Sequence, residues 1–166
     1  MYYKLQDFLN DWDFESKATL KYFNVLTDES LNQKVSPDGR TLGFIAWHIT
    51  RTIGEMMNRT GLNIETFDEN EKNPAQAKAI FEKYKKISDS FVNEIKSKWN
   101  DDNLQIEDDM YGEKWKRGIT LFSLITHQIH HRGQISVLMR QAGLKVPGFY
   151  GPAKEEWAQF GMETPL

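Results

Sequence analysis

Residues 126–134 read Thr-His-Gln-Ile-His-His-Arg-Gly-Gln and hold three of the four histidines of the chain. A helix turns by about 100° per residue, so His127 and His131 lie one turn apart on the same face. Three aliphatic residues share that face: Leu124, Ile135 and Leu138. Both rings are therefore expected to point toward a hydrophobic core. Two histidines at this spacing are typical of two ligands for one metal ion.

The composition indicates one globular domain. The chain has 166 residues, of which 39% are hydrophobic, and domains cluster at roughly 100 to 200 residues, so residues 1–166 are expected to form a single domain. The net charge of -3 provides no basic footprint for nucleic acid. No signal peptide is recognisable, and no apolar run approaches the roughly 18 residues of a membrane span. We expect a cytoplasmic protein that binds neither nucleic acid nor membrane.

Hydrophobic residues at spacings of three and four predict four long helices. These cover residues 5–26, 41–60, 74–99 and 119–142. Thr41 suits the N-cap of the second helix, and Asn73 followed by Pro74 suits the start of the third. Gly61 and Gly143 follow the second and fourth helices, where glycine commonly takes the left-handed C′ position.

Four amphipathic helices without convincing strands favour an all-α four-helix bundle, because each apolar stripe must be buried against the others. The first and third connections look long enough to cross the bundle. Periodicity leaves the order of helix directions open, and up-down-down-up is one possibility. Residues 100–118 fit either a hairpin or an irregular loop, and residues 153–160 predict a short C-terminal helix.

The remaining histidine, His48, lies at the edge of the apolar face of the second predicted helix. One divalent cation would satisfy the rings of His48, His127 and His131 and would favour their neutral form. We therefore predict a three-histidine metal site in preference to a structural histidine cluster. His130 falls on another side of its helix and is expected outside the ligand set. Gln134 lies under the metal face, where it could hold a water or a ligand.

Other residues limit the chemistry. Gln128 stands where zinc proteases of the His-Glu-x-x-His type have a glutamate, which argues against that route of peptide hydrolysis. The absence of paired Glu-x-x-His motifs favours one metal ion rather than two. Glu55, two turns after His48, is the best-placed carboxylate for a base or a fourth ligand, although most helical glutamates are simply solvated. The chain has no cysteine, so any thiol must come from outside it.

Two residues next to the histidines are expected to have structural roles. Arg132 points away from the metal face and is expected to form a salt bridge or to cap a nearby loop. Gly133 in mid-helix costs about 1 kcal/mol relative to alanine. It indicates either close approach of another segment or a tolerated surface glycine.

The upstream His48 together with His127-x-x-x-His131-Arg132-Gly133-Gln134 resembles the DinB family of YfiT-like four-helix bundles. Residues 41–48 and 143–148 add to the resemblance. It implies an up-up-down-down bundle, often a homodimer, with a divalent metal such as zinc or nickel on three histidines. The matching positions are His48, His127 and His131.

The resemblance also implies several activities. Members of the family include thiol S-transferases that use bacillithiol, mycothiol or glutathione, a thiol-dependent maleylpyruvate isomerase, and proteins described as metal-dependent hydrolases. We expect first a metal-dependent transferase in which a small thiol attacks an electrophilic substrate. The alternatives are a hydrolase with a metal-activated water and Glu55 as base, and a non-enzymatic, metal-stabilised interaction module.

Overall fold

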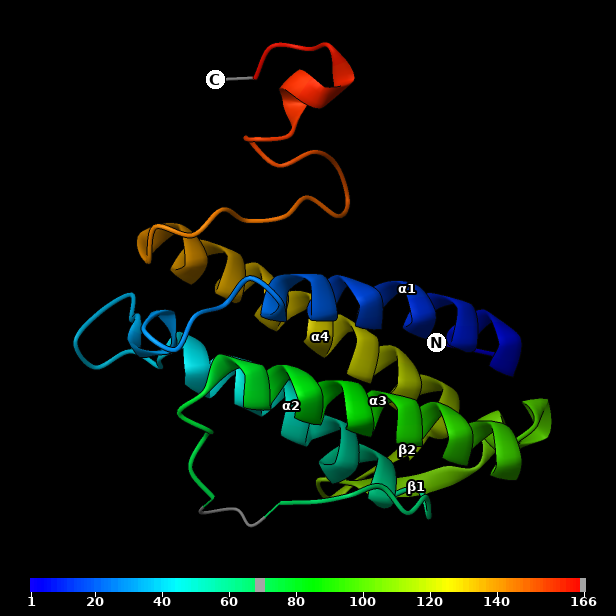
Figure 1. The fold of residues 1–166 in the computed structure, drawn as a ribbon. Coiled ribbons are helices and arrows are strands. Elements are labelled where there is room, and N and C mark those ends of the chain that lie inside the picture. Colours follow the sequence, from blue (N-terminus) through cyan, green and yellow to red (C-terminus); the bar gives the residue numbers. More distant parts are fainter. Residues whose placement is uncertain (68–70, 165–166) are drawn as a thin grey trace.

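Four helices run lengthwise through the molecule (Figure 1). They are α1 Leu5–Phe23, α2 Leu42–Asn58, α3 Ala77–Lys98 and α4 Arg117–Gln141. This computed structural model describes residues 1–67 and 71–164. Part of the polar stretch before α3, residues 68–70, and the last two residues lie outside the described chain. All four predicted helices are present, so the all-α class is confirmed.

The observed helix ends show which local sequence signals predicted a helix boundary correctly. Thr41 caps α2, because its side chain accepts a hydrogen bond of 3.0 Å from the Phe44 amide. The glycines after α2 and α4 adopt positive φ values, +82° for Gly61 and +77° for Gly143, as predicted. The start of α3 was predicted too early. Its first amide, at Ala77, donates to the Asp28 carboxylate at 2.8 Å, so a residue from the first connection satisfies this helix end.

The helices run up-down-down-up: α1 is parallel to α4, and α2 and α3 run in the opposite direction (Figure 1). This differs from the up-up-down-down order implied by the resemblance, and it is the order that periodicity left open. Because α2 and α3 run in the same direction (Figure 1), the chain crosses the length of the bundle between them, rather than in the first or third connection. The 17 residues of α2 rise by about 25 Å at 1.5 Å per residue, a length that the second connection can span.

Residues 100–118 resolve as a short 3-10 helix, η2 Asp101–Gln105, followed by an antiparallel hairpin of β1 Glu107–Met110 and β2 Glu113–Lys116. The hairpin alternative is therefore correct. The predicted C-terminal helix is shorter than expected and is a 3-10 turn, η3 Trp157–Phe160, that ends at Gly161. Another 3-10 turn, η1 Ser30–Asn32, lies in the first connection. In Figure 1 the segment after α4 extends beyond the four helices, and Tyr150 in it bonds to Glu15 of α1 and to Arg132 of α4.

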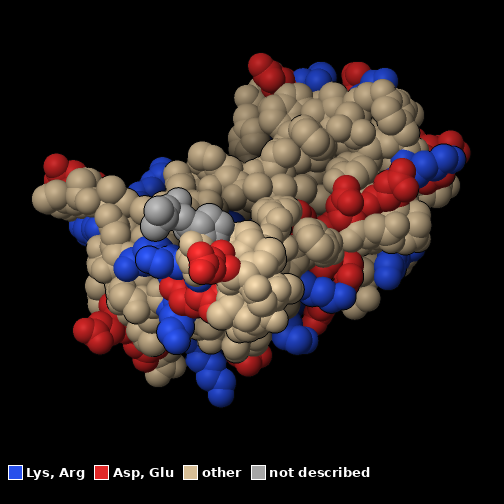
Figure 2. Space-filling view, turned by 90° about the horizontal axis from the view of Figure 1, so that it is seen from above, with Lys and Arg blue, Asp and Glu red and all other residues tan. Residues whose placement is uncertain are grey.

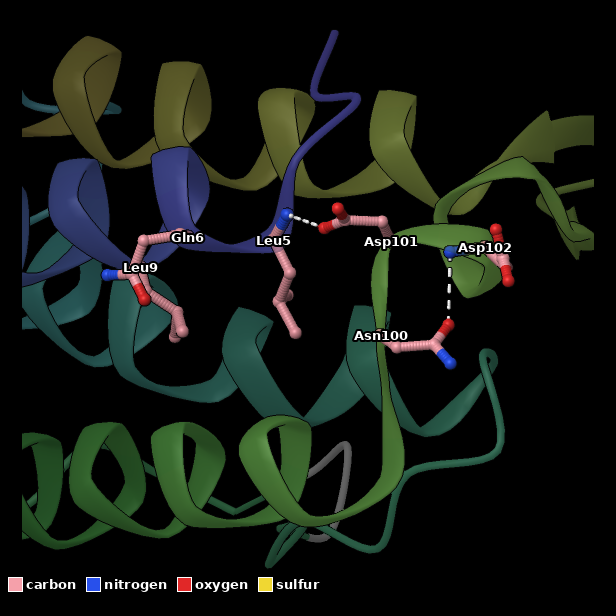
Figure 3. A pocket seen from close by; sticks show the side chains of 6 residues that line it. All are labelled: Leu5, Gln6, Leu9, Asn100, Asp101 and Asp102. Carbon is pink, nitrogen blue, oxygen red and sulfur yellow. Dashed lines mark hydrogen bonds between the residues drawn. The ribbon is translucent and has the colours of Figure 1, made fainter.

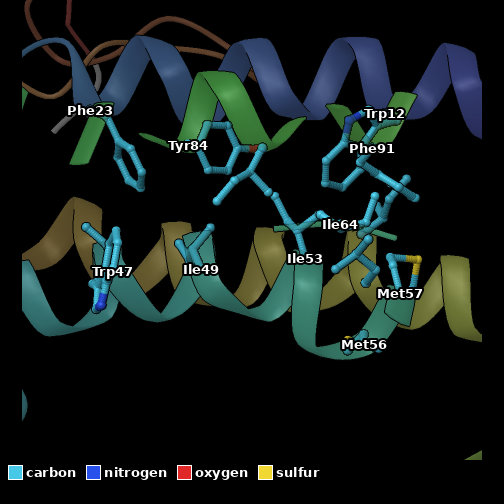
Figure 4. Close-up of a cluster of buried hydrophobic side chains, with 14 of the residues drawn as sticks. Trp12, Phe23, Trp47, Ile49, Ile53, Met56, Met57, Ile64, Tyr84 and Phe91 are labelled. Carbon is cyan, nitrogen blue, oxygen red and sulfur yellow. The ribbon is translucent and has the colours of Figure 1, made fainter. Parts of the chain in front are cut away.

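The apolar stripes meet in a continuous core (Figure 4). Aromatic rings join α1 to α3: Trp12 meets Phe91 edge-on at 5.1 Å, and Phe23 meets Tyr84 at 5.3 Å between ring centroids. Fully burying one large apolar side chain stabilises a fold by about 1.5–3 kcal/mol. This core fixes α2 and α4 against each other, which is where the histidines lie.

The charged surface carries both signs. Acidic and basic side chains are interspersed on the face shown in Figure 2, around a broad area of other residues. This face therefore presents no extended basic surface. Within the part of the chain that the structure describes, no helix combines the length and apolar character needed to cross a bilayer.

Candidate metal centre

Helices α2 and α4 bring three histidines together at their contact. His48 on α2 and His127 and His131 on α4 each offer one ligand atom, and these atoms lie within 4.8 Å of one another. The Nε2 atoms of His48 and His127 are 3.0 Å apart. Two nitrogens bonded to one tetrahedral ion at about 2.0–2.1 Å lie about 3.3 Å apart. The three side chains therefore have the spacing needed to hold one metal ion.

The helical spacing produces this cluster. His127 and His131 are one turn apart, and their ring centroids lie 4.4 Å apart. His48 approaches both rings edge-on, at 4.9 and 4.8 Å, and the Phe44 ring lies nearly parallel to the His48 ring, 6.4 Å away. His131 is buried, whereas His48 and His127 are half-buried. The rings therefore lie at the edge of the core rather than inside it.

Burial favours the neutral form of all three imidazoles. Burial lowers the pKa of His127 to about 4, and repulsion from the charged forms of His131 and His48 adds to this effect. Burial is also the main cause of the lowered pKa of His48 and of His131. A neutral imidazole keeps the lone pair that a metal ion requires, so the protonation state of the cluster suits metal binding near neutral pH.

Hydrogen bonds around the rings bear on which nitrogen is free. The Nδ1 atom of His131 lies 2.7 Å from Gln134 Oε1. An amide oxygen only accepts, so Nδ1 must carry the proton and Nε2 must present its lone pair. His127 Nδ1 is buried and has no partner among the described residues. Within the described residues, His127 therefore makes its polar contact through Nε2, which faces His48. The donor set fits a divalent ion.

Gln134 and His130 lie beside the cluster. Both side chains are exposed, and the Gln134 amide nitrogen lies 3.3 Å from His130 Nε2. Gln134 thus links His130 to His131 and touches the cluster directly, without an intervening water. His130 is outside the group of converging ligand atoms, where the helical geometry places it.

Glu55 lies two turns beyond His48 on α2 and is exposed. Its carboxylate accepts a hydrogen bond of 3.0 Å from Tyr111 at the tip of the hairpin, and Arg59 stacks on that tyrosine ring at 4.6 Å. Glu55 is not in the histidine group, but its charge acts to raise the pKa of His48 against the larger effect of burial. Glu55 is therefore a neighbour of the site. Among the described residues, no hydrogen bond joins it to any of the three histidine rings.

A cavity of about 270 Å³ adjoins His48. Its other walls are Phe44, Trp47, Arg51 and three residues that precede α3: Glu71, Lys72 and Asn73. The indole nitrogen of Trp47 is buried and has no hydrogen-bond partner in the described chain. The cavity therefore combines aromatic walls with charged side chains, directly beside one of the histidines.

A larger hollow, of about 530 Å³, lies where α1 begins (Figure 3). Its polar groups are used internally: Asp101 accepts from the Leu5 amide at 2.8 Å, and Asn100 accepts from the Asp102 amide at 3.0 Å. Leu9 and Gln6 complete the lining. None of these residues can serve as a neutral nitrogen ligand, so the histidine cluster is the stronger candidate.

A buried polar network next to the histidines was not predicted. Gln128, considered above only as a missing glutamate, is fully buried and bonded to three other helices. Arg132 is buried too, and its guanidinium forms a salt bridge with Glu15, as one of its two predicted roles required. The available signal was the pair of polar residues, Glu15 and Thr19, spaced by four within the apolar stripe of α1.

Gly133 has open space around it. A side chain added there would meet no other atom of the described residues within 4 Å. Of the two interpretations, the tolerated surface glycine is therefore correct, since no other segment of the described residues approaches this position.

Four bundled helices with three converging histidines on α2 and α4 define a class of helical proteins able to hold one divalent metal ion. The sequence model of the DinB family matches residues 1–164, and the chain belongs to that family. It is 47% identical over 165 residues to the uncharacterized protein YrdA of Bacillus subtilis (strain 168), covering 99% of each chain.

Solved structures agree on the fold. A DinB-like protein from Bacillus cereus ATCC 10987 superimposes with a TM-score of 0.86 at 44% identity, over 89% of this chain and 99% of that chain. The DinB-like protein YjoA from Bacillus subtilis matches with a TM-score of 0.68 over 86% of this chain and 97% of that chain, at 16% identity. The second likeness concerns the fold alone.

Proposed function

We propose that this protein is a metal-dependent enzyme that binds one divalent transition metal on His48, His127 and His131 and transfers a small thiol to an electrophile. The supporting observation is the composition of the cluster. Three neutral imidazoles converge, and among the described residues no carboxylate joins them. Since the chain also lacks cysteine, a thiol nucleophile would have to be supplied from outside.

Zinc and nickel are the ions we propose first, because the family resemblance implies them and imidazole ligands suit both. A divalent ion held by three imidazoles would supply open coordination positions and would deprotonate a thiol bound there. The thiol we propose is of the bacillithiol, mycothiol or glutathione type, on the strength of the family. We also propose a homodimer, on the strength of the family resemblance. Sedimentation velocity would measure the oligomeric state.

The protein's own residues would orient the reactants. Gln134 fixes the tautomer of His131 and thereby the direction of its free lone pair. Phe44 and Trp47 provide flat apolar walls beside His48, where a small apolar part of the electrophile would be shielded from water. The cavity is small, so the larger part of a thiol such as bacillithiol would extend over the surface beyond it.

Hydrolysis is the second candidate, and the position of Glu55 favours it. This carboxylate is close enough to affect the pKa of His48. Tyr111 holds it in place, so Glu55 could accept a proton from a water near the cluster. In that reaction Glu55 would act as the base, and no thiol would be needed.

Two measurements test the proposal. Elemental analysis of purified protein should find about one divalent ion per chain, and His48→Ala should lose it while His130→Ala keeps it. Metal-loaded protein is then incubated with each thiol and a haloarene or an epoxide. Turnover that needs both metal and thiol is the expected result. Ester or amide hydrolysis without thiol would identify the second candidate instead, and stoichiometric metal without either turnover would contradict an enzymatic role.

A further inference from the structure

One fully buried amide joins all four helices. The Gln128 side chain, on α4, donates from Nε2 to the Ile49 carbonyl of α2 at 3.2 Å. Its Oε1 atom accepts from the Tyr84 hydroxyl of α3 at 3.1 Å and lies 3.3 Å from Thr19 Oγ1 of α1. Gln128 has no exposed surface. A buried amide that donates from its nitrogen and accepts at its oxygen is an ordered group, since leaving either atom without a partner would be costly.

This amide joins the two helices that carry the histidines at a point next to the proposed metal ligands. Gln128 directly follows His127, and Ile49 directly follows His48. The Gln128–Ile49 hydrogen bond therefore links α2 and α4 one residue away from each of two histidines whose Nε2 atoms are 3.0 Å apart. A change in helix separation at this hydrogen bond would also change the distance between those nitrogens.

The chemical identity of residue 128 follows from the same contacts. The amide must donate to a carbonyl and accept from a hydroxyl at once. An ionised glutamate could accept but could not donate to Ile49, and a buried carboxylate would need a charge partner. One turn later, Arg132 joins α4 to α1 rather than to α2. It directly follows His131 and bonds to Glu15 and Thr19 on α1.

We propose that Gln128 is a positioning residue for the metal centre: its hydrogen bond to Ile49 sets the separation of His48 and His127, and so the affinity and coordination geometry of the ion. This inference rests on the proposed metal site. It goes beyond that site because Gln128 is not a ligand and touches none of the three rings in the recorded hydrogen bonds.

The test compares Gln128→Met with Tyr84→Phe. Both remove hydrogen bonds from the same buried amide, but only the first removes the link to α2. Co²⁺ is added to metal-free protein, its visible absorption spectrum is recorded, and the dissociation constant of Zn²⁺ is measured by competition with a chelating dye. Thermal unfolding is followed in parallel, so that a loss of stability can be separated from a loss of metal affinity.

Gln128→Met should weaken Zn²⁺ binding by about 10-fold, the lower end of the range for groups that hydrogen-bond a metal ligand directly, and should shift the Co²⁺ spectrum. Tyr84→Phe should leave both the affinity and the spectrum close to those of the unmodified protein. If Gln128→Met does not fold, Gln128→Asn replaces it, because its shorter amide cannot keep both contacts.

An unchanged affinity and spectrum in the Gln128 variant would overturn the inference and leave the metal site intact. Equal losses in the Gln128 and Tyr84 variants, in proportion to their loss of thermal stability, would overturn it as well. If the unmodified protein binds neither Co²⁺ nor Zn²⁺, the proposed function and this inference fall together.

Discussion

The Nε2 atoms of His48 and His127 lie 3.0 Å apart across the contact of α2 and α4. Two neutral imidazoles in this arrangement can share only one proton between the facing nitrogens, and protonating both would place two positive charges side by side. Binding of a divalent ion removes this conflict, because both nitrogens then act as lone-pair donors. The metal-free and metal-bound proteins should therefore respond differently to acid.

The lowered pKa of His127, about 4, predicts that the metal-free protein becomes less stable in acid. Between pH 6.5 and 4 the unfolded chain binds a proton at this residue that the native chain does not bind. The free energy of unfolding should therefore fall as the pH falls through this window, by at most about 3 kcal/mol. Urea unfolding of metal-free protein at pH 7.5, 5.5 and 4.5 measures the change. The variant His127→Asn should show a smaller dependence, and an identical slope would contradict the assignment to His127.

Gln134 should control metal affinity through His131. Removing the acceptor of His131 Nδ1 in Gln134→Ala is expected to weaken Zn²⁺ binding by about 10- to 100-fold, because the ring loses the bond that fixes its tautomer. Gln134→Glu retains an acceptor and should bind nearly as well as the unmodified protein. A competition titration with a chelating dye gives the values. His130→Ala is the matched control, and an equal loss in that variant would show that the surface around the cluster, not the hydrogen bond, is responsible.

Arg132 should be essential for stability. It is 3% exposed, and its guanidinium contacts the Glu15 carboxylate and the Tyr150 hydroxyl. Replacing it in Arg132→Met leaves Glu15 as an unpaired buried charge, which typically costs about 3–5 kcal/mol. At about 2–4 °C per kcal/mol for a chain of this size, the melting temperature should fall by roughly 10 °C. Adding Glu15→Gln should recover part of the loss, and a second variant that is no more stable than the first would argue against the charge.

Two glycines of α4 should respond to alanine in opposite directions. Gly133→Ala meets open space and should stabilise the protein by up to about 1 kcal/mol, the difference between the helix propensities of the two residues. Gly118→Ala would place a Cβ atom 2.1 Å from the Tyr2 carbonyl oxygen and should destabilise it by about 1–3 kcal/mol. Thermal unfolding of the pair at one pH distinguishes them. A stabilising Gly118→Ala would mean that the N-terminal segment moves away easily.

Local patterns in the sequence predicted what depends on neighbours along the chain. The apolar spacing gave the four helices, Thr41 and Gly61 marked the ends of α2, and the i, i+4 pair of His127 and His131 fell on one face. These features follow from the geometry of one helix. His48 could be added because it was the one histidine left.

Features that depend on distant partners were not predictable in the same way. The first turn of α3 is capped by Asp28, which is 49 residues away in the sequence, so the local Asn73-Pro74 signal was misleading. The direction of α3 depends on which connection crosses the bundle. The lengths of the connections alone did not identify that connection. The bonds of Gln128 reach residues 44 to 109 positions away, and no periodicity reports such contacts.

The up-down-down-up order also constrains when the histidine cluster can form during folding. His48 and His127 are 79 residues apart, and the chain between them contains the crossover, α3 and the hairpin. Closing so long a loop is entropically slow compared with forming local contacts. We therefore expect the ligands to assemble late, after most of the bundle. An added ion should then bind the native chain and slow its unfolding much more than it speeds its refolding.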